Sequence, residues 1–62
     1  MIHPIKLQRV LRGLTQLELS RQTGIPNNKI CLVERGYKTL RTDEIQKICQ
    51  VLQVAPEQLQ GN

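Results

Sequence analysis

Apolar residues recur at helical spacing in short segments, and glycine or proline residues separate these segments. The clearest stripe follows Thr42, where apolar side chains three, four and seven positions apart share one face of an α-helix. These side chains are Ile45, Ile48, Cys49 and Leu52. Thr42 is expected to cap this helix, which should end near Gln53. No segment shows the sustained alternation of a β-strand, so the pattern predicts an all-α fold.

A second helix begins with a strong capping signal at Thr15. Glu18 lies three positions after Thr15, which is the spacing of a capping box. Gly24 permits the left-handed backbone conformation that ends a helix at a sharp turn. The helix should therefore occupy residues 16 to about 23.

Three further short helices complete the prediction. Pro4 and Pro56 suit the first turn of a helix, where the backbone N–H that proline lacks has no helical partner. Gly13 and Gly36 suit helix ends. The predicted spans are 4–12, 27–35 and 56–59. Five short helices with tight connections predict one domain over residues 1–62, with its core from about residue 5 to residue 59.

The composition argues against an enzyme. The chain has 62 residues, without tryptophan or phenylalanine, and is too small to enclose a substrate pocket of roughly 300–1,000 Å³. His3 is isolated, and Cys31 and Cys49 are far apart with no metal-ligand spacing, so two buried thiols are expected. No nucleophile–base pair or glycine-rich phosphate loop is visible. We therefore expect no catalysis, no cofactor, no metal site and no small-molecule substrate.

The charge is uneven along the chain. The formal net charge is +4, with basic residues in excess over residues 1–41 and acidic residues in excess over residues 42–62. Such a balance favours a polyanionic partner, although a merely solvated basic surface would look the same. The sequence has no signal peptide and no apolar run of transmembrane length, so we expect a cytoplasmic protein without membrane contact.

The stretch from residue 16 to residue 35 predicts a helix-turn-helix. Its two short helices flank a turn at Gly24, and the small Ser20 lies where the partner helix must approach closely. Ile25 follows the turn and can fill the angle between the helices. This arrangement makes the helices cross steeply and leaves the outer side of the second exposed, so that it can enter the DNA major groove.

A set of residues spread over most of the chain carries a resemblance to a known family. They are Arg9, Gly13-Leu14-Thr15-Gln16, Leu19, Gly24-Ile25, Ile30, Glu34-Arg35-Gly36, Ile45, Ile48, Leu52 and Leu59. With them the sequence resembles the phage repressor/Cro (XRE) family of helix-turn-helix proteins, without a gap from about residue 5 to residue 59. It departs from the family pattern at Ser20, Pro26 and Leu40. The resemblance implies a lambda-repressor-like fold and a homodimer that binds double-stranded DNA.

The resemblance also implies which side chains contact DNA bases. The matching positions are Asn27, Asn28, Lys29 and Leu32. Their chemistry agrees, because asparagine pairs with adenine, lysine donates to guanine and leucine packs on a thymine methyl. Each has a plainer interpretation too: the asparagines as turn formers and helix caps, Lys29 as a solvated charge and Leu32 as a core residue.

Other positions are implied to hold the DNA backbone or the fold. The phosphate-binding positions are Gln16, Arg35, Lys38 and Arg41. Arg9 and Glu34 match a pair that forms a structural salt bridge in this family. The sequence thus predicts a sequence-specific transcriptional regulator of repressor or controller type that binds a two-fold symmetric operator. The alternative is an antitoxin or adaptor-like protein-interaction module with the same fold.

Overall fold

The structure is a computed structural model that describes residues 2–59, and within this range it is helical without strands. The four α-helices and one 3₁₀ helix are α1 (Pro4–Leu11), α2 (Gln16–Thr23), α3 (Asn27–Glu34), α4 (Thr42–Leu52) and η1 (Pro56–Leu59). The predicted all-α fold is therefore confirmed. The fifth element differs from the expected α-helix, because its four residues form one 3₁₀ turn.

The start of α2 has the local structure that the sequence predicts. The backbone N–H of Glu18 donates to the Thr15 hydroxyl at 3.1 Å, and the backbone N–H of Thr15 donates to the Glu18 carboxylate at 2.9 Å. This capping box satisfies N–H groups that the helix leaves without partners. Gly24 ends the helix with a φ of 77°, in the left-handed region that favours glycine.

The start of α4 differs from the prediction by one residue. Thr42 was expected as the N-cap, but Thr42 is already helical and Arg41 is the N-cap. The backbone N–H of Arg41 donates to the carboxylate of Glu44 at 2.9 Å, so the glutamate of the first turn satisfies this donor. The carboxylate of Glu44 also stands where the dipole of α4 favours negative charge.

One apolar core joins all five elements. The buried apolar side chains are Ile5, Leu19, Ile25, Ile30, Val33, Ile48, Cys49, Leu52 and Leu59. Each helix thus contributes one or more side chains, as the spacing of apolar residues predicts. Leu59 on η1 is only 5% exposed and belongs to this core.

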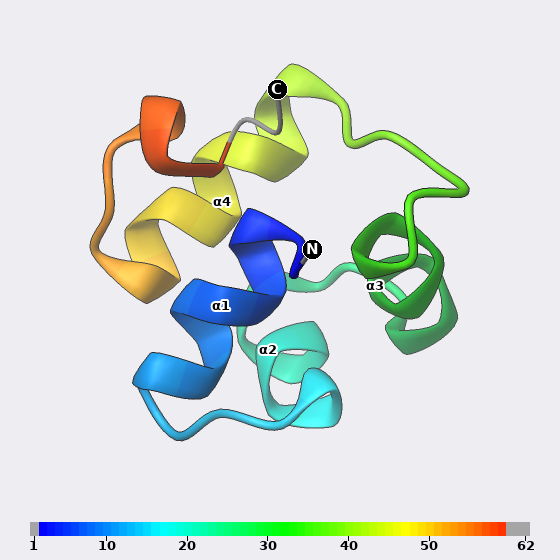
Figure 1. Ribbon diagram of the computed structural model, residues 1–62, viewed down its shortest axis with the longest axis horizontal. Helices are drawn as coiled ribbons and strands as arrows, with labels where there is room; N and C mark the ends of the chain where they lie inside the picture. Colours follow the sequence, from blue (N-terminus) through cyan, green and yellow to red (C-terminus); the bar gives the residue numbers. More distant parts are fainter. Residues whose placement is uncertain (1, 60–62) are drawn as a thin grey trace.

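Helix α3 lies at one side of the domain, as Figure 1 shows, and a loop over residues 35–41 leads from its end to α4. Helix α2 packs on both α3 and α4, and α1 packs on α3 and η1. On α1, Leu7, Val10 and Leu11 are exposed. No helix in residues 2–59 is long and apolar enough to cross a membrane.

Candidate nucleic-acid interface

Side-chain hydroxyls fix the turn between α2 and α3. The hydroxyl of Ser20 donates to the carbonyl of Ile25. The hydroxyl of Thr23 donates to the carbonyl of Leu19 at 2.7 Å and accepts from the backbone N–H of Ile25 at 3.3 Å. The side chain of Ile25 is 3% exposed and fills the angle between the helices. The turn is therefore hydrogen-bonded and packed, so it sets the angle at which α3 leaves α2.

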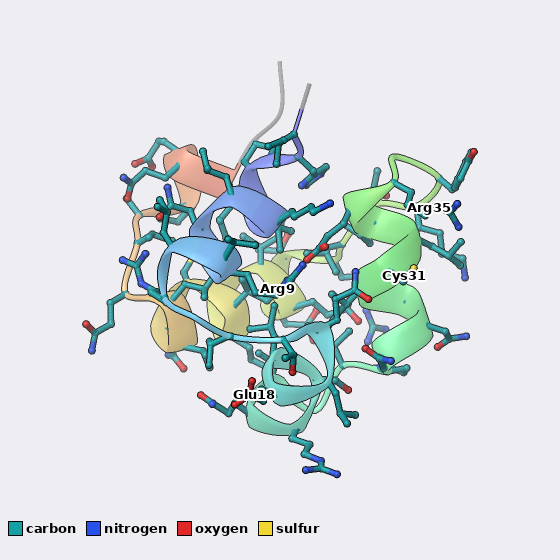
Figure 2. All side chains as sticks on the ribbon, turned by 60° about the horizontal axis from the view of Figure 1, so that its bottom comes forward. Arg9, Glu18, Cys31 and Arg35 are labelled. Carbon is teal, nitrogen blue, oxygen red and sulfur yellow. The ribbon has the colours of Figure 1, made fainter. Side chains whose placement is uncertain are left out.

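Helix α3 buries one side and presents the other to solvent. Ile30 and Val33 are buried in the core. Figure 2 shows Cys31 and Arg35 on the side of α3 that faces away from the rest of the domain. Asn27 and Asn28 at the helix start are exposed, and Leu32 is half-buried. The outward surface is therefore a strip of amide and apolar groups with a guanidinium at its end.

Cys31 is a residue of the outward surface that the sequence analysis missed. It was expected to be a buried thiol, but it is half-buried and points outward (Figure 2). The signal was present, because residues 30 and 33 mark the buried side and each helical step turns the chain by about 100°. Cys49, in contrast, is buried as expected, and burial raises the pKa of its thiol. Both cysteines are free.

The structure places Lys29 against α4 instead of on the outward strip. Its ammonium donates to both oxygens of the Glu44 carboxylate, at 2.8 and 2.9 Å. The side chain of Lys29 is 24% exposed and that of Glu44 is 8% exposed. The hydrogen bond from Lys29, followed by that from the Arg41 backbone, lowers the pKa of Glu44. This ion pair links the first turn of α3 to the first turn of α4.

A second ion pair links the end of α3 to α1 and α2. The guanidinium of Arg9 donates to both oxygens of Glu34, at 2.8 and 3.0 Å, and to the carbonyl of Leu14 at 2.7 Å. The side-chain amide of Gln16 also donates to Glu34, at 2.9 Å. Burial raises the pKa of Glu34, but the hydrogen bonds from Arg9 and Gln16 outweigh it and leave this pKa below the ordinary value.

The cations that follow α3 remain open to solvent. Arg35 and Lys38 are exposed, and the guanidinium carbon of Arg35 lies 6.0 Å from the centre of the Tyr37 ring. The side chain of Arg41 is 74% exposed, with Asp43 at 3.7 Å. A shallow hollow beside α3 is lined by Lys29, Gly36, Tyr37, Lys38 and Thr39. Of the four predicted phosphate-binding residues, Gln16 donates a hydrogen bond to the carboxylate of Glu34, and Arg41 forms exposed ion pairs with Asp43 and Glu44.

The packed turn between α2 and α3, together with the solvent-facing side of α3, defines a helix-turn-helix domain. A family model described as helix-turn-helix matches residues 5–59, which is most of the chain. The chain belongs to this family, the XRE or Cro/C1 type, and is a DNA-binding transcriptional regulator. No curated protein and no solved structure matches it. Within residues 2–59, no three histidine, cysteine or acidic side chains gather as metal ligands.

Proposed function

We propose that this protein binds a two-fold symmetric DNA operator as a homodimer and represses transcription there. The observation that carries the proposal is the outward side of α3, a solvent-facing strip (Figure 2) that is followed in the chain by the exposed cations Arg35, Lys38 and Arg41. A short helix presented in this way fits the major groove, which is about 12 Å wide. Repression requires only that the bound protein occupy DNA that the transcription machinery needs.

The exposed groups divide into base contacts and backbone contacts. Asn27 and Asn28 can each make a bidentate pair with adenine, and Leu32 can pack on a thymine methyl. The proposed phosphate contacts are Gln16, Arg35, Lys38 and Arg41. Contacts to phosphate fix the position of the protein and make its affinity fall with salt, but they carry no sequence information.

The shortness of α3 supports the proposal of a dimer. A single eight-residue helix touches few base pairs, whereas two copies joined by a two-fold axis double the contacted sequence. Half-sites in such a complex lie about one helical turn apart, roughly 10 base pairs from centre to centre. The proposal therefore expects a palindromic site with that spacing.

Selection of bound duplexes from a random pool tests the proposal directly. The expected result is a palindromic motif that Asn28→Ala weakens by roughly five- to 100-fold, as expected for loss of a base contact. Gln50→Ala changes an exposed amide on α4 and should leave binding unchanged. A single, non-palindromic half-site would contradict the homodimer. An absence of any enriched motif would contradict DNA reading and favour the protein-interaction alternative.

A further inference from the structure

We infer that the half-site facing α3 consists mainly of A·T base pairs, because Glu44 withdraws the one lysine of α3 from base recognition. The inference rests on the proposed function, since it concerns the same DNA site. It assigns Lys29 the role of a positioning residue, which holds the start of α3 on α4. It leaves base recognition to the amide and apolar groups of the outward strip.

The geometry of Glu44 explains why Lys29 stays in place. The side chain of Glu44 is 8% exposed, and its carboxylate accepts two hydrogen bonds from Lys29 and one from the Arg41 backbone. Moving the ammonium to a base would leave a buried carboxylate without its main counter-charge, which is costly. The guanidinium of Arg41 lies 3.8 Å from Glu44, but it is 74% exposed, so water screens that attraction.

Without Lys29, the outward strip holds no cation among the residues that face the middle of a half-site. Apart from Arg35 at its end, the strip comprises Asn27, Asn28, Cys31 and Leu32. Asparagine amides match the N6 and N7 edge of adenine, and leucine packs on the methyl group of thymine. A free cysteine behaves as a small apolar group with a weak donor, so Cys31 also suits a thymine methyl.

Guanine recognition in the major groove commonly uses arginine or lysine. On α3 the cation left for this purpose is Arg35 at the C-cap, beyond the last helical residue. A guanine contact from Arg35 would therefore fall at an edge of the half-site. The central positions are left to A·T pairs with thymine methyls directed toward α3.

The test compares motifs selected by the wild-type chain with those selected by Lys29→Met, Lys29→Gln and Glu44→Gln, after circular dichroism has shown each variant folded. We expect central A·T pairs for the wild type, with base preferences changed less than about twofold in both Lys29 variants; a lost base contact costs roughly fivefold or more. Lys47→Met removes an exposed lysine of α4 and serves as the matched control.

Glu44→Gln tests the same ion pair from the other side, because it releases Lys29 instead of removing it. The glutamine retains an oxygen for the Arg41 backbone N–H but removes the charge that holds Lys29. The freed ammonium should add about one phosphate contact, which steepens the slope of log affinity against log salt by about 0.9. A wild-type motif with a central guanine that both Lys29 variants lose would overturn this inference alone. An absence of any motif would overturn the proposed function and this inference with it.

Discussion

The two ends of α3 are attached to the domain by ion pairs of different quality. At its C-terminal end, Glu34 receives a two-pronged guanidinium from Arg9, and the two side chains are 2% and 10% exposed. At its N-terminal end, Lys29 reaches Glu44 with one ammonium, at 24% and 8% exposure. Arginine holds a carboxylate in a fixed plane, whereas lysine is a point charge on a flexible stem. The helix is therefore held more rigidly at its end than at its start.

The two ends of α3 also have different tasks. The C-terminal pair connects α1, α2 and α3 and so anchors the end of α3 on the body of the domain. The N-terminal pair lies beside the asparagines that are proposed to contact bases, where small adjustments help a protein to fit DNA. Three predictions distinguish the two attachments, in order of decreasing effect.

Glu34→Ala should have the largest effect. It leaves the buried guanidinium of Arg9 without its carboxylate, and breaking a buried pair from one side costs about 3–5 kcal/mol. A domain of this size should lose roughly 12–40 °C in Tm for such a change. Chemical denaturation measures the free energy of unfolding, with Glu57→Ala as an exposed-charge control. Equal stability of Glu34→Ala and the wild type would show that the C-terminal attachment contributes nothing.

Lys29→Met should lower the stability by less, about 1–2 kcal/mol. The carboxylate of Glu44 loses two donors but keeps the backbone N–H of Arg41, and methionine retains much of the apolar stem. The same denaturation experiment, with Lys47→Met as control, gives the difference. A loss as large as that of Glu34→Ala would contradict the proposed ranking of the two attachments.

Mild acidification should lower the stability of the domain less than either substitution does. The pKa values of Glu34 and Glu44 are lower in the folded chain than their ordinary value of 4.5. Each carboxylate therefore contributes stability that is fully present above the unfolded pKa and is lost as pH falls through the lower folded pKa. The Tm should thus be nearly constant from neutral pH to about pH 5 and fall at lower pH. If the Tm of Glu34→Gln fell with pH as much as that of the wild type, the ionised carboxylate of Glu34 would not be a source of this stability.

Local rules account for what the sequence predicts correctly. The capping box at Thr15 and Glu18 and the apolar stripe of α4 depend on neighbours within one or two helical turns, so spacing alone reveals them. The start of α4 was predicted one residue too late. Thr42 is a common N-cap residue, but the Glu44 carboxylate accepts the backbone N–H of Arg41, so that Arg41 takes the N-cap position.

Tertiary contacts account for what the sequence does not predict. Lys29 and Glu44 lie 15 positions apart on different helices, so no local spacing indicates that they meet. This ion pair turns the ammonium of Lys29 toward α4, a contact that the family resemblance does not indicate. Arg9 and Glu34 are 25 positions apart, and the resemblance, not a local pattern, brought them together in the sequence analysis. The site is therefore predictable as a helix face, but its individual donors require the packed structure.

Tyr37 gives the molecule a built-in optical probe. The chain contains one tyrosine and no tryptophan, so its near-ultraviolet emission comes from a single ring. This ring is 73% exposed on the loop after α3, beside Arg35 and away from the apolar core. Because water already surrounds it in the folded chain, unfolding changes its environment little, whereas a duplex docked on α3 would lie close to it. Intrinsic fluorescence of this protein therefore reports on occupancy of that surface more than on melting.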